Sequence, residues 1–332
     1  MSKKRGSTKW FVIGGLIAAA VAIYTVFFNG KLLYFTFGMS KDDILKTDNI
    51  SIPATAADIF LSDDKAAIVD VADESVLNAD VNGETLQTNI KNSVKSRLTR
   101  IASLNHMASK KGVVLGHVKR ENVRKAASDY YQSLTDEEKK YLGTDTKELE
   151  KIFTLYALAD EMKEVLMRDS AIEVSTDEAR VISIQYICAD SETDIKEAKK
   201  KLENGTPFYD VASEYNGNTE FSAELVRGET HESFEEAAYA LKSGQTSDIV
   251  AAGDKYYIIK CSSDNEQSKT DANREALFEK EQSEFFNKVL IPYENDLYFE
   301  FDENKWNEKD LKNIPDMGVR FDDVYVKHMK EG

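Results

Sequence analysis

The feature that most constrains this chain is an uncharged apolar run near its N-terminus. Trp10 to Phe28 are nineteen residues without a charged side chain, and residues 1–9 before them hold four basic residues and no acid. One helix of that length spans a hydrocarbon core of about 30 Å. Because Lys and Arg favour the cytoplasmic side, the run predicts a single-pass signal-anchor in the cell membrane, with residues 30–332 outside the cytoplasm.

Two other interpretations of this run stay open. Ala20-Val21-Ala22 has the small-x-small form of a cleavage site, so the segment also fits a cleavable signal peptide. The apolar run continues from Ile23 to Phe28, which favours an anchor. A buried core helix is disfavoured, because the segment is apolar all round and lies at the extreme N-terminus. The anchor and the signal peptide both predict an exported protein.

Charge and residue counts exclude several function classes. With 43 Lys and Arg against 59 Asp and Glu, the net charge is −16, which repels phosphate backbones, so we expect no nucleic-acid partner. Two cysteines and four scattered histidines give no metal-ligand spacing. The sequence also lacks the glycine-rich phosphate loops and the G-x-S-x-G motif. We therefore expect neither a metal nor a cofactor.

Helical patterns dominate the first half of the exported part. Leu86, Ile90, Val94 and Leu98 form an apolar stripe at helical spacing. A capping box at 135–138 predicts the start of a second helix, and a third is expected from about residue 147 to 167. Pro53 and mixed polarity leave residues 40–82 without an assignment.

The C-terminal region predicts one more amphipathic helix, from about Ala272 to Asn295, ending near Pro292. We expect this helix and the tail, residues 265–332, to pack back on the helical domain of residues 30–175. The middle segment, residues 176–264, is then an insertion into that domain.

The inserted segment changes character. Arg180 to Cys188 alternates like a half-buried strand, and helical spacing follows at residues 195–202 and 208–215. A second capping box at 233–236 predicts a short helix through Leu241. Strands are expected at 247–251 and 256–261. The fold class is therefore α+β, with an antiparallel sheet flanked by helices.

Several of these residues resemble a known family. Phe234-Glu235-Glu236-Ala237-Ala238-Tyr239-Ala240-Leu241-Lys242-Ser243-Gly244-Gln245-Thr246-Ser247, followed by Tyr256-Tyr257-Ile258-Ile259-Lys260, resembles the parvulin (PpiC) family of peptidyl-prolyl isomerases, and 205–215 and 227–229 fit the same pattern. A membrane-tethered helical domain interrupted by such a module is similar to the extracytoplasmic PrsA/SurA-type foldases and chaperones, especially those of Gram-positive bacteria.

The resemblance implies a set of site residues. Phe234 matches the family's ring-binding aromatic residue, with Tyr239 and Leu241 as its packing in the substrate-binding pocket, and Ser247 matches a polar residue on the pocket floor. A plain core role for Phe234 stays open. Gln185 and Tyr257 align with two family histidines that lie side by side, and we expect these two residues to hydrogen-bond each other.

The loss of both histidines leaves more than one function open. The first is a peptidyl-prolyl cis-trans isomerase with a variant, slow or inactive site, which assists the folding of newly exported polypeptides at their X-Pro bonds. The second is a catalytically inactive parvulin-fold chaperone that holds unfolded chains, or an adaptor of the cell envelope. The two cysteines, Cys188 and Cys261, are expected on different strands as buried free thiols.

Overall fold

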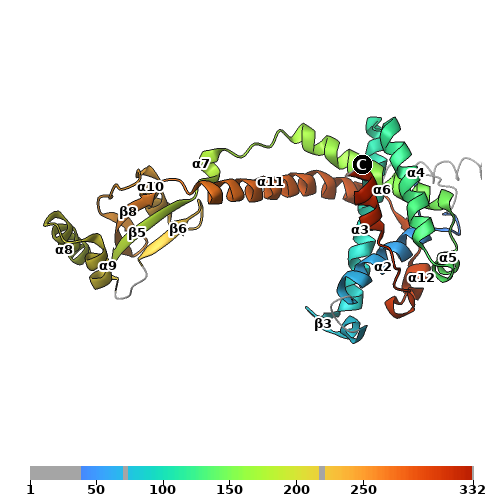
Figure 1. The fold of residues 1–332 in the computed structure, drawn as a ribbon, viewed down its shortest axis with the longest axis horizontal. Coiled ribbons are helices and arrows are strands. Elements are labelled where there is room, and N and C mark those ends of the chain that lie inside the picture. The colour runs from blue at the N-terminus through green and yellow to red at the C-terminus, as the bar shows by residue number, and fades with distance from the viewer. Residues whose placement is uncertain (1–38, 70–73, 217–220, 331–332) are drawn as a thin grey trace, which may run out of the picture. The chain divides into compact units, whose positions relative to one another are not determined.

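The computed structural model describes residues 39–69, 74–216 and 221–330 (Figure 1). The chain divides into two units: the described residues up to Arg168 join those from Asn287 onward, and Asp169–Phe286 form the other. Helices and strands are both present, so the predicted mixed class is confirmed. Across the described ranges no helix combines the length and apolarity that a membrane span needs, and the predicted span, Trp10–Phe28, lies outside them.

The first unit is mainly helical. Its elements are β1 (Asp43–Thr47), β2 (Ile50–Pro53), α2 (Ala54–Val69), η1 (Glu74–Asn78), β3 (Asp80–Val81), β4 (Glu84–Thr85), α3 (Leu86–Lys111), α4 (His117–Ser133), α5 (Asp136–Leu142), α6 (Thr146–Ser170), the last part of α11 (Gln267–Asp296), β9 (Glu300–Phe301), α12 (Glu303–Glu308), η2 (Leu311–Asn313) and α13 (Phe321–Met329). A small antiparallel sheet has the order β2-β1-β9, so the C-terminal segment returns to the first strand.

The predicted helical features of this unit are confirmed. The stripe Ile90, Val94 and Leu98 is buried along α3. The capping box at Thr135 forms in full, since its hydroxyl accepts from the Glu138 amide while the glutamate side chain accepts from the Thr135 amide. The third predicted helix is α6. The predicted C-terminal helix is α11, which begins earlier than predicted, at Gln267, and ends at Asp296, one residue beyond the predicted Asn295, with Pro292 inside its last turns.

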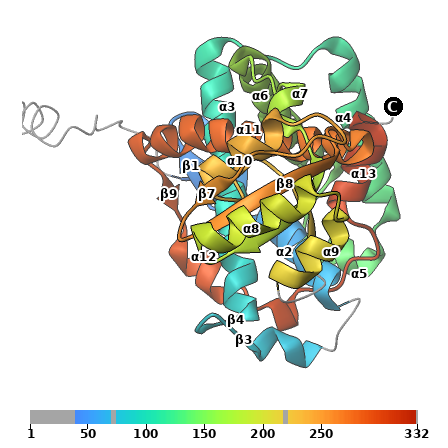
Figure 2. The same cartoon turned by 90° about the vertical axis from the view of Figure 1, so that its left-hand side faces the viewer.

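The second unit carries a four-stranded antiparallel sheet of order β6-β5-β8-β7. Figure 1 labels β5, β6 and β8, and Figure 2 labels β7 and β8. Its elements are α7 (Thr176–Ala179), β5 (Ile182–Ala189), α8 (Glu192–Glu203), α9 (Phe208–Tyr215), β6 (Ser222–Leu225), α10 (Glu232–Ala240), β7 (Val250–Ala252), β8 (Lys255–Ser263) and the first part of α11.

The two faces of this sheet have separate cores, as strand alternation requires. Ile184 and Ile259 pack with Phe234 of α10 on one face. Ile187 and Ile258 pack on the other face, with apolar side chains of α8 and α9. The parity of a β5 residue, that is, whether its number is even or odd, therefore decides which helices it packs against: even-numbered residues face α10, and odd-numbered residues face α8 and α9.

Two local predictions in this unit are wrong. The capping box at Ser233 does not form: α10 begins at Glu232 with His231 as its N-cap, and the Ser233 hydroxyl donates to the Ala251 carbonyl at 3.1 Å. A tertiary bond to the neighbouring strand thus replaces the local cap. The strand predicted at 247–251 is shorter and later, since β7 covers Val250–Ala252.

Candidate functional site

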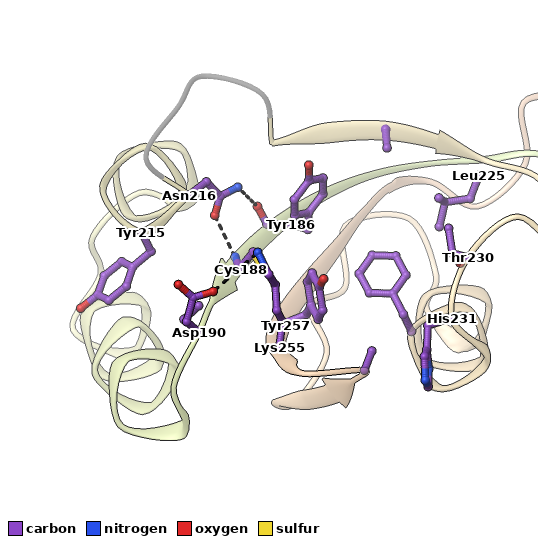
Figure 3. Close-up of a pocket in the computed structure, with 14 residues that line it drawn as sticks. Tyr186, Cys188, Asp190, Tyr215, Asn216, Leu225, Thr230, His231, Lys255 and Tyr257 are labelled. Atoms are coloured by element: carbon purple, nitrogen blue, oxygen red, sulfur yellow. Dashed lines mark hydrogen bonds and ion pairs between the residues drawn. The ribbon is translucent and has the colours of Figure 1, made fainter.

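A pocket of about 540 Å³ opens on the α10 side of the sheet (Figure 3). Residues of β5, β6, β7, β8, α10, the end of α9 and the adjoining loops line it: Tyr186, Cys188, Ala189, Asp190, Tyr215, Asn216, Ala223, Leu225, Thr230, His231, Phe234, Ala252, Lys255 and Tyr257. The lining contains aromatic rings, a thiol and a few charged groups near one end, which is the usual make-up of a site for a small, mostly apolar group.

Three aromatic rings make the apolar corner of the pocket. The ring centroids of Phe234 and Tyr257 are 4.9 Å apart, and Tyr186 lies 6.4 Å from each of them, all in edge-to-face arrangements. Phe234 is 8% exposed, and both tyrosines are half-buried. Edge-to-face packing at these distances stabilises each ring and fixes its orientation. The corner is therefore a preformed apolar surface with two hydroxyl groups.

The Tyr257 hydroxyl belongs to a polar pair with Cys188. These residues face each other across the ladder between β5 and β8. Burial, and next the neighbouring Cys188 thiol that shares a hydrogen bond with it, raise the pKa of Tyr257 to about 12. The tyrosine therefore stays protonated at neutral pH and can donate a hydrogen bond into the pocket.

Asn216 completes the edge of β5 beside the pocket. Its side-chain oxygen accepts from the Cys188 amide at 2.8 Å, and its nitrogen donates to the Tyr186 carbonyl at 3.1 Å (Figure 3). The pairing of β5 with β6 ends at Gln185, and the Asn216 side chain provides hydrogen-bond partners for two main-chain groups of β5 beyond that point. Asp190 and Lys255 form an ion pair of 3.5 Å at the same end, and both are solvent-exposed.

The prediction that Gln185 and Tyr257 lie side by side is wrong. Gln185 pairs with Lys260, whereas Tyr257 pairs with Cys188. Gln185 has the parity of Ile187 and therefore lies on the α8 and α9 side of the sheet. Tyr186 stands in the pocket instead, because a slip of one residue along a strand exchanges the two faces.

The other predicted site residues lie outside the lining of this pocket. The Ser247 hydroxyl accepts from the Ile259 amide at 2.9 Å and donates to the Asp248 carbonyl at 2.7 Å, so its bonds support the backbone. Leu241 is the C-cap of α10, and Tyr239 is buried in the core beneath that helix. Of the six predicted residues, only Phe234 and Tyr257 line the pocket.

Tyr239 holds α10 against the edge of the sheet. Its hydroxyl donates to the Arg180 carbonyl at 2.8 Å and lies 2.9 Å from the Leu225 carbonyl, and burial raises its pKa to about 12. We expect Tyr239→Phe to lower the free energy of opening of this unit by about 1–3 kcal/mol, because the one hydroxyl proton shared by these two main-chain carbonyls is lost. Hydrogen exchange of the β5 and β6 amides measures this free energy of opening. Tyr209→Phe, at an exposed tyrosine of the same unit, is the matched control. Equal effects of the two variants would contradict the assignment.

Sequence reasoning missed Tyr186 and Cys188 as pocket residues. The strand alternation gave only part of the signal, since both have the parity of the buried Ile182 and Ile184, whereas Ile187 and Ala189 are buried with the opposite parity. Cys188 is half-buried and Cys261 is buried, and both are free thiols. Cys261 pairs with Ile184, away from Cys188, which agrees with the expectation that no disulfide joins them.

Comparison with known proteins confirms the PrsA-type resemblance over part of the chain. The chain is 33% identical to foldase protein PrsA 3 of Bacillus cereus over 116 residues, which cover 31% of this chain and 41% of the relative. It is 36% identical to foldase protein PrsA 1 of Listeria innocua over 111 residues, 30% of this chain and 38% of the relative. The chain thus spans less than half the length of these relatives. No family model matches it.

Solved structures of similar proteins include the PrsA peptidylprolyl isomerase of Bacillus cereus, at 19% identity and a TM-score of 0.35, covering 76% of this chain and 99% of that one. The PrsA peptidylprolyl isomerase of Bacillus anthracis aligns at 24% identity and a TM-score of 0.28, covering 59% and 95% of the two chains.

Proposed function

We propose that the sheet-containing unit is a peptidyl-prolyl cis-trans isomerase that assists the folding of exported polypeptides. The observation that carries this proposal is the aromatic corner formed by Tyr186, Phe234 and Tyr257, in a chain that is similar to PrsA foldases. A proline ring is a compact apolar group that fits against such a surface, and the flanking peptide has polar partners at the rim.

The chemistry requires no nucleophile. Resonance gives the X-Pro amide a rotation barrier of about 18–20 kcal/mol. Phe234 and the two tyrosine rings hold the proline ring and exclude water from the amide, and the pocket accelerates rotation only where it binds the twisted amide more tightly than either planar form. The Tyr257 hydroxyl is placed to donate to the polar groups of the twisted peptide.

The roles of the remaining predicted residues are revised within this proposal. Tyr186 takes the place in the pocket that the alignment gave to Gln185. Tyr239, Leu241 and Ser247 act as positioning residues, because their contacts fix α10 and the backbone next to β8.

A second candidate function is a holdase that binds unfolded chains without catalysis. The polar groups of the pocket favour this function, because the strands hold tyrosine and cysteine where the resemblance implies a pair of histidines. Among the described lining residues the one histidine is His231, which lies at the N-cap of α10. A pocket of this kind binds proline whether or not it stabilises the twisted amide.

We also propose that the chain is attached to the cell membrane through Trp10–Phe28, with the units described above outside the cytoplasm of a Gram-positive type of cell. The uncharged run and the basic residues before it support this orientation.

The test is the rate of cis-trans isomerisation of X-Pro peptides by the full chain. We expect Phe234→Ala and Tyr186→Ala each to lower kcat/KM by about tenfold or more. A tenfold change needs the loss of only about 1.4 kcal/mol of transition-state stabilisation. Gln185→Ala, on the opposite face, is the matched control and keeps the rate. A folded full chain that binds proline peptides without accelerating isomerisation contradicts the isomerase and leaves the holdase.

A further inference from the structure

The turn between α3 and α4, residues 111–120, displays two exposed valines. Val114 is 73% and Val118 is 70% exposed, the highest values among large apolar side chains of the described residues. The turn is nevertheless well built: Leu115 is buried, its carbonyl accepts from the Arg120 guanidinium at 2.8 Å, and the Val113 amide donates to the Ala108 carbonyl. The valines are therefore exposed on a fixed backbone. The turn that carries them connects α3 to α4, both labelled in Figure 1.

The charge around these valines is opposite to that of the chain. The net charge is −16, yet the segment from Met107 to Arg120 contains no acid. Lys111, His117 and Arg120 are all exposed, and no ion pair involves Lys111 or Arg120 within the described part of the chain.

Acidic groups beside the turn are already paired, including Glu121, which follows Arg120 and pairs with Arg124. Asp48 lies 3.6 Å from Lys110, and Lys119 lies 2.6 Å from Glu161 and 3.2 Å from Glu164. The turn thus combines exposed apolar side chains with unneutralised basic ones. That combination binds the interface of an anionic bilayer, where apolar groups enter the headgroup region and cations meet lipid phosphates.

The turn is also within reach of the predicted membrane span. Ten residues, 29–38, separate Phe28 from the first described residue, and they extend at most about 35 Å. The five residues of β1 span about 17 Å. The strand is followed by Asp48, which pairs with Lys110 near the end of α3. The tether is therefore long enough for the turn to touch the surface into which the chain is anchored.

We propose that the α3–α4 turn docks on an anionic phospholipid surface, with Val114 and Val118 in the headgroup region and Lys111 and Arg120 on lipid phosphates. This inference rests on the proposed membrane attachment and adds a second contact to it. Docking fixes the helical unit at the membrane surface, where exported chains emerge.

The test uses the full chain in phosphatidylcholine vesicles with and without phosphatidylglycerol, carrying brominated acyl chains. Val114→Trp should be quenched more strongly than the background of Trp10 and Trp306, and only in vesicles that contain phosphatidylglycerol. Adding Lys111→Glu and Arg120→Glu should weaken docking by about fivefold or more for each reversed charge. Tyr209→Trp, 55% exposed in the other unit, is the matched control and should show no extra quenching.

Flotation of the wild-type chain with phosphatidylcholine vesicles reports the anchor separately. A chain that floats while Val114→Trp is quenched no more than Tyr209→Trp overturns the docking proposal and leaves the anchor intact. A chain that does not float overturns the anchor, and quenching by added anionic vesicles then still supports the turn as a lipid contact. A blue shift of Val114→Trp fluorescence that rises with protein concentration in the absence of lipid assigns the turn to a second copy and contradicts docking on lipid.

Discussion

Replacing Phe321 by alanine is expected to destabilise the helical unit by about 3–5 kcal/mol, the usual cost of removing a large aromatic side chain from a packed core. Phe321 is fully buried at the first position of α13. Its ring stacks on Phe153 at 4.1 Å and meets Phe60 and Tyr156 edge-on at 5.3 Å each. One ring from the C-terminal segment thus joins α2 and α6.

Urea unfolding, followed by a spectroscopic signal of the helical unit, measures the decrease in the free energy of unfolding. Val326→Ala is the matched control. Val326 lies on the same short helix but is 43% exposed, so its truncation should change stability by less than about 0.5 kcal/mol. Similar effects of the two variants would show that α13 is not part of the core.

Apolar stripes and a capping box predicted α3, α5, α6 and α11, whereas α2, α4 and α13 were not predicted as separate helices. Sixteen residues form α2, and most of the side chains described in it are buried, on nearly every side of the helix and including Ser62 and Lys65. A helix that is surrounded on all sides shows no amphipathic period, so periodicity cannot reveal it. The polar residues that obscured the pattern bind the C-terminal segment: Ser62 donates to the Pro315 carbonyl and Lys65 to the Ile314 carbonyl.

In the sheet-containing unit β5 and β8 were predicted and β7 was predicted in a shifted position, but neither β6 nor the register was predicted. The alternation of 180–188 located β5 correctly, but it did not decide which of two adjacent residues faces α10. Cross-strand pairing makes that decision, since Cys188 lies opposite Tyr257. Phe234 was found because it belongs to a specific motif, whereas Tyr186 follows only from the register.

Asp63 is the buried carboxylate with the strongest expected influence on pH dependence. Its two oxygens accept from the amides of Phe321 and Asp322, at 3.2 and 3.3 Å, and so hold the start of α13. Burial raises the pKa of Asp63 from 3.8 to about 7, the two amide hydrogen bonds oppose this shift, and the Asp322 carboxylate adds to it. The folded unit therefore keeps a proton that the unfolded chain has lost between about pH 4 and 7.

A proton held only in the folded state makes the unit more stable in acid. Stability falls as pH rises wherever the folded state binds more protons, so the contribution of Asp63 is present below about pH 4 and is lost as pH rises through about 7. At about 1.4 kcal/mol for each pKa unit, the shift corresponds to about 4 kcal/mol over the whole window. Between pH 8 and 5.5 a part of this gain, about 2 kcal/mol, should appear.

Urea unfolding of the wild type, Asp63→Asn and Asp316→Asn between pH 5.5 and 8 tests this expectation. Asp63→Asn keeps an oxygen for one amide but cannot titrate, so its stability should vary less with pH than that of the wild type. The control residue, Asp316, is exposed in the segment before α13, and its variant should follow the wild-type profile. All other ionisable groups are shared by the wild type and Asp63→Asn, so the difference between their two profiles isolates Asp63. Parallel profiles for the wild type and Asp63→Asn would show that this carboxylate is already ionised across the range, with its two amide hydrogen bonds outweighing burial.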